Sequence, residues 1–183
     1  MLNSNQIKLS IIVVTYNSIN EIGDCLDALI EPNPIQGFSF EVIVIDNASA
    51  DGTFAYLEKK YLNNNLFKLV YNNENTGFAL ACNQGVQMAT GQYVMLLNPD
   101  TVAQVNSIVQ LVQYIDSNED VGVVGPRILD EFGTAQESYG NQLTVKQEFI
   151  GKLLYSKYFE IFPFVKKWKH KKLTSNKITE VGW

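Results

Sequence analysis

The 183-residue chain is predicted to adopt an α/β fold in which helices flank a mostly parallel β-sheet. Two observations predict this class. Up to about residue 125, short apolar runs alternate with segments of helical periodicity, a pattern typical of repeated βα units. Hydrophobic residues make up 46% of the chain, which is enough to form one core of ordinary size.

Five apolar runs are expected to form the strands. Each is short and rich in β-branched or aromatic residues, which favour strands. In chain order they are Leu9–Thr15, Phe40–Ile45, Phe67–Tyr71, Tyr93–Leu97 and Val121–Val124. The last run is the shortest of the five.

Four helices are expected between these strands, because apolar residues recur there with the spacing of one helix face. The expected faces are Ile22, Cys25, Leu26 and Leu29; Phe54, Leu57 and Tyr61; Phe78, Ala81, Cys82, Gly85, Val86 and Ala89; and Ile108, Leu111, Val112 and Ile115. Asn17, Ser18 or Asn20 is expected to cap the first helix, and Ser49 or Asp51 the second. The two cysteines lie on apolar faces, so they are interpreted as small buried hydrophobes rather than as a disulfide or metal ligands.

The regular alternation fades after Gly125-Pro126. Residues 1–125 are therefore expected to form the α/β core, and residues 126–183 a second region of loops and short strands. The chain stops at Val181-Gly182-Trp183, which resembles the start of another strand. We therefore expect the sequence to end within a domain, so that the fold is truncated.

The charge distribution excludes one class of partner. The net charge of −5 combines −11 over residues 1–140 with +6 over residues 141–183. An acidic body is a poor partner for nucleic acid. No apolar run reaches the ~18 residues of a membrane span, and the N-terminus has no signal-peptide pattern, so a cytoplasmic protein is predicted.

The basic segment, residues 146–177, has three interpretations. It mixes lysines with aromatic residues such as Phe149, Tyr158 and Trp168. Such a mixture suits peripheral contact with the inner face of an anionic membrane. It also suits a helix that covers the sheet with its lysines in water, or a protein interface. His170, the only histidine, lies in this segment, which excludes histidine-rich metal sites.

Polar clusters follow four of the expected strands. They are Thr15-Tyr16-Asn17, Asp46-Asn47-Ala48-Ser49, Asn75-Thr76-Gly77 and Asn98-Pro99-Asp100. Ligands of open α/β sheets bind outside the carboxyl ends of the strands, so these clusters predict one convergent site. The alternative for each cluster is an ordinary turn or helix cap, which uses the same residue types.

Three aspartates are the strongest candidates for a chemical role. Asp46 closes an expected buried strand, where a carboxylate can accept a hydrogen bond from a ribose hydroxyl or a base imide. Asp51, beside Gly52, is more simply a helix cap. Asp100 is a candidate metal ligand, because Mg2+ often takes one or two carboxylates together with substrate phosphates. The competing interpretation is that Asp100 belongs to a turn that caps the next helix.

Four blocks of sequence resemble one known family. They are Val13–Ser18 (VVTYNS), Val44–Thr53 (VIDNASADGT), Asn75–Gly85 (NTGFALACNQG) and Leu96–Asp100 (LLNPD). Together, and in this order, they resemble family 2 glycosyltransferases of the GT-A fold, with the rhamnosyltransferase-like branch as the nearest likeness. The resemblance implies a Rossmann-like sheet that binds a nucleoside-diphosphate sugar and a divalent metal, Mg2+ or Mn2+.

The resemblance also implies roles for matching positions. The implied nucleotide-sugar-binding residues are Thr15, Tyr16 and Asn17 around the base, Asp46 at base or ribose, and Asn75, Gly77 and Asn83 around ribose and diphosphate. Asn47 and Asn98 are implied nucleotide-sugar-binding residues as well. Asp100 matches the metal-binding last residue of the family's Asp-x-Asp motif. Asn98 stands at its first acidic position, which leaves one carboxylate for the metal.

The implied activity is inverting transfer of a sugar, with dTDP-rhamnose as a named candidate donor, to a glycan or lipid-linked acceptor in cell-surface polysaccharide synthesis. The family's catalytic base lies in an acidic motif that this sequence lacks, so no catalytic base is named. Two alternatives remain. One is a non-catalytic nucleotide-sugar-binding fragment. The other is a sugar-nucleotide pyrophosphorylase, which would need a glycine-rich loop with basic residues after the first strand.

Overall fold

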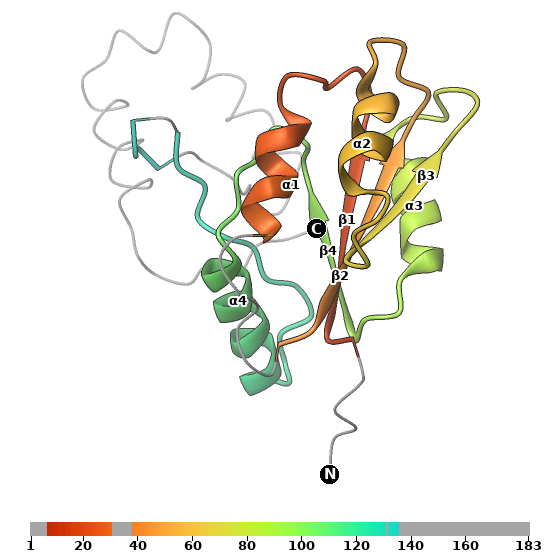
Figure 1. Ribbon diagram of the computed structural model, residues 1–183. Helices are drawn as coiled ribbons and strands as arrows, with labels where there is room; N and C mark the ends of the chain where they lie inside the picture. Colours follow the sequence, from red (N-terminus) through yellow and green to blue (C-terminus); the bar gives the residue numbers. More distant parts are fainter. Residues whose placement is uncertain (1–6, 31–37, 131, 136–183) are drawn as a thin grey trace, which may run out of the picture. The chain divides into compact units, whose positions relative to one another are not determined.

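A computed structural model of the chain describes residues 7–30, 38–130 and 132–135. These residues contain four strands that alternate with four helices (Figure 1). In chain order the elements are β1 (Leu9–Thr15), α1 (Ile22–Ile30), β2 (Phe40–Asp46), α2 (Thr53–Tyr61), β3 (Phe67–Tyr71), α3 (Phe78–Met88), β4 (Tyr93–Leu97) and α4 (Val105–Ser117). The predicted α/β class is confirmed.

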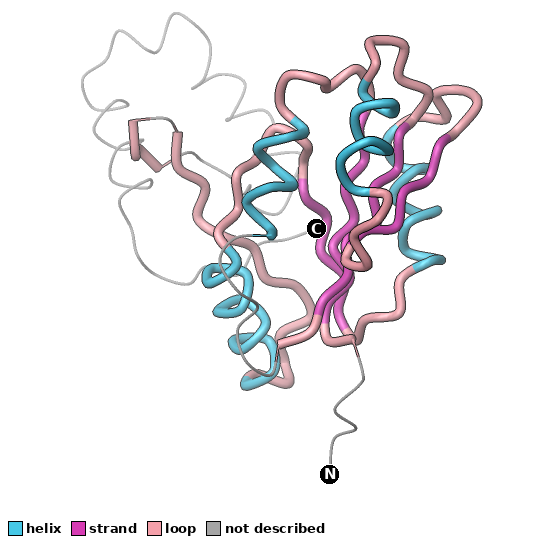
Figure 2. The backbone as a smooth tube through the Cα atoms, in the orientation of Figure 1, coloured by secondary structure: helices cyan, strands magenta, loops and turns pink. Residues whose placement is uncertain are grey.

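All four strands are parallel, and they lie in the order β3-β2-β1-β4. Figure 2 shows the strands in magenta, with helices in cyan around them. Parallel pairing brings the carboxyl ends of the strands to one edge of the sheet. The register is explicit there: Thr15 lies opposite Asp46, and Asp46 lies opposite Tyr71. The edge at which the strands end is called the carboxyl edge below.

The sheet is covered on both faces, which explains its long apolar strands. Alternate residues of β1 point to opposite sides. Ile11 and Val13 pack in a core with residues of α1, α2 and α4, whereas Ile12 and Val14 pack against α3. At Gly85 of α3, an added Cβ would lie 2.5 Å from Ile12 Cγ2. Glycine therefore permits α3 to approach β1 closely, as its small-residue face predicts.

The prediction of a fifth strand at Val121–Val124 is wrong. These residues are described as irregular chain, and Val123 is 62% exposed. The N–H of Val121 is used in a turn, where it donates to the carbonyl of Asn118 at 3.0 Å. A short apolar run becomes a strand only where a neighbour takes up its backbone hydrogen bonds, and no strand of the described sheet does so.

The prediction that Phe78 and Val86 lie on the buried face of α3 is also wrong. Phe78 is 58% exposed and Val86 is 47% exposed, so the buried face is narrower than the apolar pattern. Among the helices described here, none is long and apolar enough to cross a bilayer.

The described residues divide between Val124 and Gly125, and residues 125–130 and 132–135 belong to a second unit. Its described part contains one antiparallel bridge, between Leu129 and Ala135. The carboxylate of Asp130 closes the intervening turn by accepting the N–H groups of Phe132 at 3.0 Å and Thr134 at 2.7 Å. The expected division at residues 125 and 126 stays a prediction. The basic segment, residues 146–177, lies outside the described residues.

A buried carboxylate ties together the starting ends of three strands. Glu41 Oε1 accepts hydrogen bonds from Ser10 Oγ at 2.7 Å and from the N–H and hydroxyl of Thr90 at 2.8 and 2.7 Å. Its Oε2 pairs with Lys68 Nζ at 2.6 Å. Burial raises the pKa of Glu41, but these partners outweigh it and lower the pKa to about 2.

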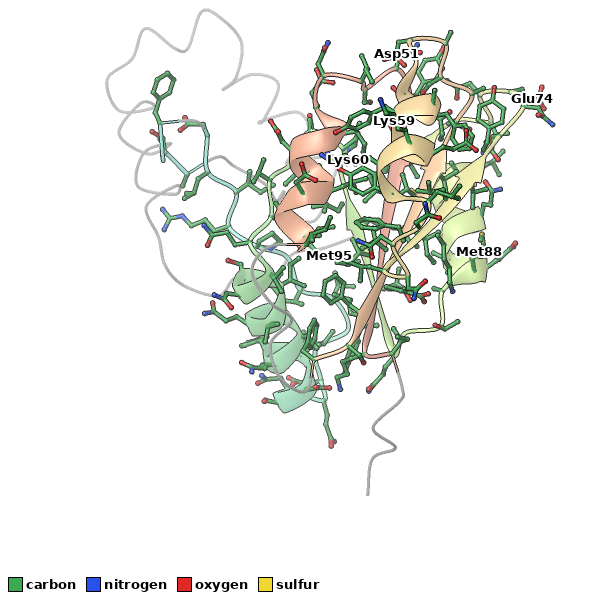
Figure 3. All side chains as sticks on the ribbon, in the orientation of Figure 1. Asp51, Lys59, Lys60, Glu74, Met88 and Met95 are labelled. Carbon is green, nitrogen blue, oxygen red and sulfur yellow. The ribbon has the colours of Figure 1, made fainter. Side chains whose placement is uncertain are left out.

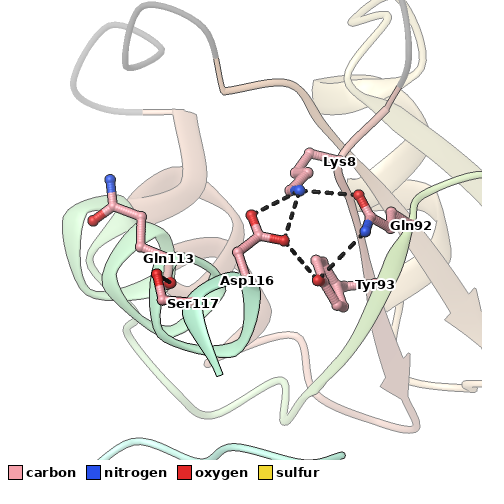
Figure 4. Close-up of polar contacts among 6 residues, drawn as sticks. All are labelled: Lys8, Gln92, Tyr93, Gln113, Asp116 and Ser117. Atoms are coloured by element: carbon pink, nitrogen blue, oxygen red, sulfur yellow. Dashed lines mark hydrogen bonds and ion pairs between the residues drawn. The ribbon is translucent and has the colours of Figure 1, made fainter. Parts of the chain in front are cut away.

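A second polar cluster fixes the end of α4 to the sheet (Figure 4). Asp116 pairs with Lys8 Nζ at 2.7 Å and accepts the Tyr93 hydroxyl at 2.6 Å. Lys8 Nζ also donates to Gln92 Oε1 at 2.9 Å. Because Tyr93 begins β4 and Lys8 precedes β1, this cluster lies at the opposite end of the sheet from the carboxyl edge.

Candidate functional site

The last residues of β1 and β2 form the centre of the candidate site. Thr15 and Asp46 face each other in the strand register, and both are fully buried. The N–H of Asn47 donates to the Thr15 carbonyl at 2.8 Å, and the N–H of Asn72 donates to the Asp46 carbonyl at 2.9 Å. The backbone around Asp46 is therefore held from both neighbouring strands.

Two buried side-chain oxygens at this point have no hydrogen-bond partner among the described residues. They are Thr15 Oγ1 and Asp46 Oδ2. The other carboxylate oxygen of Asp46 accepts the N–H of Ser49 at 2.8 Å. A buried polar atom without a partner costs about 1–3 kcal/mol and calls for an explanation. A ligand that supplies a hydrogen-bond donor to this pair is such an explanation.

Asn17 links the loops that follow β1 and β2. Its N–H donates to Ser49 Oγ at 2.8 Å, and its Oδ1 accepts the N–H of Ala50 at 2.8 Å. Both Asn17 (φ 53°) and Ala48 (φ 66°) have left-handed backbones, which asparagine adopts more readily than alanine. The expected cap of α1 by the Asn17 side chain is therefore wrong, because the oxygen of its amide is used between the loops. The carbonyl of Ser18 accepts the Ile22 N–H at 3.0 Å.

Asp51 lies beside the start of α2, but the predicted cap by Ser49 or Asp51 is wrong, because Gly52 holds the N-cap position and no side chain caps the helix. The Asp51 carboxylate accepts the N–H of Thr53, the first residue of α2, at 3.0 Å, and the N–H of Ile19 at 3.1 Å. Burial raises the pKa of Asp51, but the hydrogen bonds from Thr53 and Ile19 outweigh it and lower the pKa. Figure 3 shows Asp51 and Glu74 on loops at the same end of the molecule, which is the carboxyl edge.

Asn47 connects the end of β2 to the turn that precedes α3. Its Nδ2 donates to Asn75 Oδ1 at 2.8 Å, and its Oδ1 accepts the N–H of Thr76 at 3.2 Å. Asn75 Oδ1 also accepts the N–H of Gly77 at 2.9 Å. Gly77 has φ 84°, a conformation that favours glycine. Asn47, Asn75 and Gly77 are thus brought together by side-chain hydrogen bonds.

Tyr16 and Asn83 stand apart from this network. Tyr16 follows Thr15 directly and is 50% exposed. Asn83 is exposed on α3. The structure therefore gives Tyr16 an accessible ring at the carboxyl edge, and it gives Asn83 no contact that ties it to Asp46.

The turn after β4 carries Asn98 and Asp100, both exposed. Because β4 pairs with β1, this turn starts beside the end of β1. The Asn98 carbonyl accepts the Thr101 N–H at 3.2 Å and lies 3.5 Å from Cys25 Sγ of α1. The pKa of Cys25 is raised to about 12 by burial and then by the charge of Asp100.

Asp100 does not cap the next helix, so that interpretation is wrong. Helix α4 begins at Val105, and Gln104 holds its N-cap position. The side chain of Asp100 has one long contact, from Thr101 Oγ1 at 3.5 Å, which leaves its carboxylate accessible. Within the described ranges, no group of three or more His, Cys, Asp or Glu side chains could hold a metal. Asp100 can therefore contribute a single carboxylate.

Sequence reasoning missed two residues of this site. Asn72 and Gln84 form a pair of hydrogen bonds, each 3.0 Å, and Asn72 Nδ2 also reaches Asn47 Oδ1 at 3.1 Å. A signal existed for Asn72, since it directly follows β3 and polar residues after strands mark such sites. Gln84 stands within the block Asn75–Gly85 that carries the family resemblance, but its local pattern does not distinguish it from a surface glutamine of a helix.

Comparison with known proteins identifies the family. The family model described as glycosyl transferase family 2 matches residues 10–173. The chain belongs to glycosyl transferase family 2. A poly-beta-1,6-N-acetyl-D-glucosamine synthase of Staphylococcus epidermidis is 30% identical over 122 residues, which is 66% of this chain and 29% of that protein. The chain spans about a third of the length of the first three relatives that it matches, at 35%, 29% and 38%.

Two solved structures share the fold. The Pyrobaculum calidifontis mannosyltransferase PcManGT, in complex with GDP-Man and Mn2+, is 28% identical with a TM-score of 0.54, and the match covers 62% of this chain and 34% of that one. S. aureus TarS 1–349, in complex with UDP-GlcNAc, is 26% identical with a TM-score of 0.55, covering 68% and 39%. The predicted GT-A architecture is therefore confirmed for the sheet and its helices.

Proposed function

We propose that the carboxyl edge of this chain binds a nucleoside-diphosphate sugar, and that the protein transfers the sugar to a glycan or lipid-linked acceptor in cell-surface polysaccharide synthesis. One observation carries the proposal: two facing strand ends bury Thr15 Oγ1 and Asp46 Oδ2 without partners, in a chain of family 2. The likeness to structures with GDP-Man and UDP-GlcNAc, and to a polysaccharide synthase, supports it.

The nucleoside is proposed to lie against Asp46. The unpartnered Oδ2 is an acceptor, and it suits the imide N–H of a base or a hydroxyl of ribose. Tyr16 offers an exposed aromatic ring one residue beyond Thr15, on which a base can stack. In this arrangement Asn17 and Asn47 act by holding the loops, because the structure uses their amides in internal hydrogen bonds.

The sugar-diphosphate is proposed to extend toward Asn75, Gly77 and Asn83 on one side and toward Asn98 and Asp100 on the other. Asp100 would hold a divalent metal, Mg2+ or Mn2+. One accessible carboxylate fits this group, because such cations bind through one or two carboxylates together with substrate phosphates and water. The bound metal would supply positive charge to the departing diphosphate. The Mn2+ in the PcManGT structure supports a metal of this kind.

The proposed reaction is inverting transfer. An acceptor hydroxyl attacks the anomeric carbon, a new C–O bond forms, and the bond between that carbon and the diphosphate oxygen breaks. The electron pair leaves with the diphosphate, and the hydroxyl proton passes to a carboxylate base. We assign that base to no residue of this chain. A donor such as dTDP-rhamnose, and peripheral contact of residues 146–177 with the cytoplasmic face of a membrane, belong to the same proposal.

Calorimetric titration tests the binding step. The chain is titrated with dTDP, UDP and GDP, each with Mg2+, with Mn2+ and with EDTA. We expect one nucleotide to bind more tightly in the presence of metal. Asp100→Ala should remove the metal-dependent part of the affinity, and Asp46→Ala should weaken free nucleotide and nucleotide sugar equally. Asp116→Asn, at the other end of the sheet, serves as the control and should bind like the parent chain.

The outcomes separate the candidate functions. No binding of any nucleotide would overturn the proposal. Nucleotide-sugar binding without sugar transfer to any acceptor would favour the alternative, a non-catalytic binding fragment. Equal affinity of Asp100→Ala with metal and with EDTA is expected, whereas a retained metal effect would refute Asp100 as the ligand. The pyrophosphorylase alternative is disfavoured by the match to glycosyl transferase family 2.

A further inference from the structure

We infer that Asn72 and Gln84 are positioning residues of the nucleotide site, acting through Asn47. This inference rests on the proposed function, but it concerns two residues whose side chains are assigned no contact with the ligand. Asn72 follows β3, Gln84 lies in the middle of α3, and Asn47 follows β2. The three side chains join three separate elements beside Asp46.

The hydrogen bonds form an unbranched relay from α3 to β2. Gln84 Nε2 donates to Asn72 Oδ1, and Asn72 Nδ2 donates back to Gln84 Oε1, both at 3.0 Å. Asn72 Nδ2 uses its second hydrogen toward Asn47 Oδ1 at 3.1 Å. The amide group of Asn72 is therefore engaged on its oxygen and on its nitrogen. All of these side chains are buried or half-buried, which strengthens the bonds.

Backbone donors fix the orientation of the Asn47 amide. The N–H of Thr76 can only donate, so the Asn47 atom that it reaches at 3.2 Å must be oxygen. The N–H of Gly77 likewise requires oxygen at Asn75, which leaves Asn47 Nδ2 as the donor to Asn75. Asn72 must then present nitrogen to Asn47. Gln84 completes this arrangement, because its reciprocal pair satisfies the Asn72 oxygen and the remaining N–H of the Asn72 amide.

The relay controls the turn that faces the proposed ligand. Asn47 is 2% exposed and directly follows Asp46, so a change in its side chain is transmitted to the strand end that carries the unpartnered oxygen. Asn47 also holds Asn75 and Thr76, which precede the start of α3. Loss of Gln84 leaves the Asn72 amide held by Asn47 alone, so the Asn72 side chain is less firmly placed and its bond to Asn47 weakens. The turn and Asp46 lose their fixed relative position.

The test compares variants of the 183-residue chain with and without nucleotide. Gln84→Ala and Asn72→Ala remove either half of the pair, and Gln84→Glu keeps the acceptor for Asn72 while losing the donor. Gln87→Ala is the matched control, because Gln87 is an exposed glutamine of the same helix. Nucleotide affinity is measured by calorimetry, thermal midpoints by circular dichroism, and hydrogen exchange at the Thr76 and Gly77 amides by NMR without nucleotide.

We expect Gln84→Ala and Asn72→Ala to bind nucleotide about three- to tenfold more weakly, which is the effect of one or two net hydrogen bonds. The double variant should bind no more weakly than either single variant, because the two residues act as one unit. Gln84→Glu should recover part of the affinity. Exchange at Thr76 and Gly77 should accelerate in both alanine variants but not in Gln87→Ala.

The two readouts distinguish this inference from the proposed function. If the parent chain binds nucleotide and the Gln84 and Asn72 variants bind equally well, the inference is overturned while the proposed function stands. If exchange accelerates but the parent chain binds no nucleotide, the relay is correct as architecture and the proposed function fails, and the positioning role with it. A lower thermal midpoint with unchanged affinity and unchanged exchange would mean that the pair only stabilises the fold.

Discussion

The substitution Thr15→Val tests whether the carboxyl edge is built for a ligand rather than for stability. Thr15 Oγ1 is buried without a partner in the described part of the chain. Valine has nearly the same shape and a strong strand preference. The substitution therefore removes one unpartnered oxygen from the core of the site and leaves the packing of β1 intact.

The structure gives opposite signs for stability and binding. A buried polar group without a partner costs about 1–3 kcal/mol, so its replacement by a methyl group should raise the free energy of unfolding by about 1 kcal/mol or more. That corresponds to a rise of several degrees in the thermal midpoint. A ligand that bonds to the hydroxyl loses about 0.5–1.5 kcal/mol of binding, so nucleotide affinity should fall roughly two- to tenfold.

A second threonine provides the matched control. Thr53 is also fully buried, but its Oγ1 accepts the Ser18 N–H at 3.1 Å and donates to Asp51 at 2.6 Å. Thr53→Val leaves the Ser18 N–H without its acceptor and removes one of the hydrogen bonds to Asp51, so it should lower the thermal midpoint. The midpoints of both variants are measured by differential scanning calorimetry, and their affinities by titration. If Thr15→Val is destabilised as much as Thr53→Val, the Thr15 hydroxyl is structural and the ligand interpretation is refuted.

Two further predictions concern the starting ends of the strands. The pKa of Glu41 is lowered from 4.5 to about 2, so its ionised carboxylate should contribute at most about 3 kcal/mol to the free energy of unfolding above pH ~4.5, and this contribution is lost as the pH falls toward 2. In urea titrations from pH 7 to 3, the free energy of unfolding of Glu41→Gln should therefore fall less at acid pH than that of the parent chain. The same acid dependence in both proteins would contradict the assignment. Gly91→Ala should lower the free energy of unfolding by about 1–3 kcal/mol, because a Cβ would lie 2.5 Å from Ser10 N and 2.7 Å from the Leu9 carbonyl carbon. Gly122→Ala is the control: it has open space around it, so the same urea titration should show a nearly unchanged free energy of unfolding.

The sequence predicts the periodic elements well, for a physical reason. Both β1 and β2 are buried on two faces and appear as continuous apolar runs, and the helices between them need one apolar face. These patterns depend on local spacing alone. Val121–Val124 is also mostly valine, but no strand of the described sheet lies beside it. Strand formation depends on the pairing partner as much as on the run itself.

The sequence predicts where the candidate site lies, but it does not predict which of its side chains have hydrogen-bonding atoms available for a ligand. The rule that ligands bind at carboxyl ends of parallel strands places Thr15, Asp46 and Asn47 at one edge, and the structure brings them together. The rule does not say which of them have free hydrogen-bonding atoms. The Asn17 and Asn47 side-chain amides form hydrogen bonds within the chain. These bonds depend on loop conformations, which the spacing of apolar residues does not predict.

Two carboxylates of one strand show why that difference matters. Glu41 and Asp46 both lie in β2 and are both buried, yet Glu41 has both oxygens bonded while Asp46 keeps one unbonded. A fold that needed Asp46 only for stability would gain by pairing it, as it pairs Glu41 with Lys68 and Thr90. The unpaired oxygen of Asp46 lowers the stability of the fold, and it lies at the carboxyl edge, where ligands of parallel sheets bind. The contrast between the two residues, rather than the presence of an aspartate, is the physical argument that this edge binds a ligand.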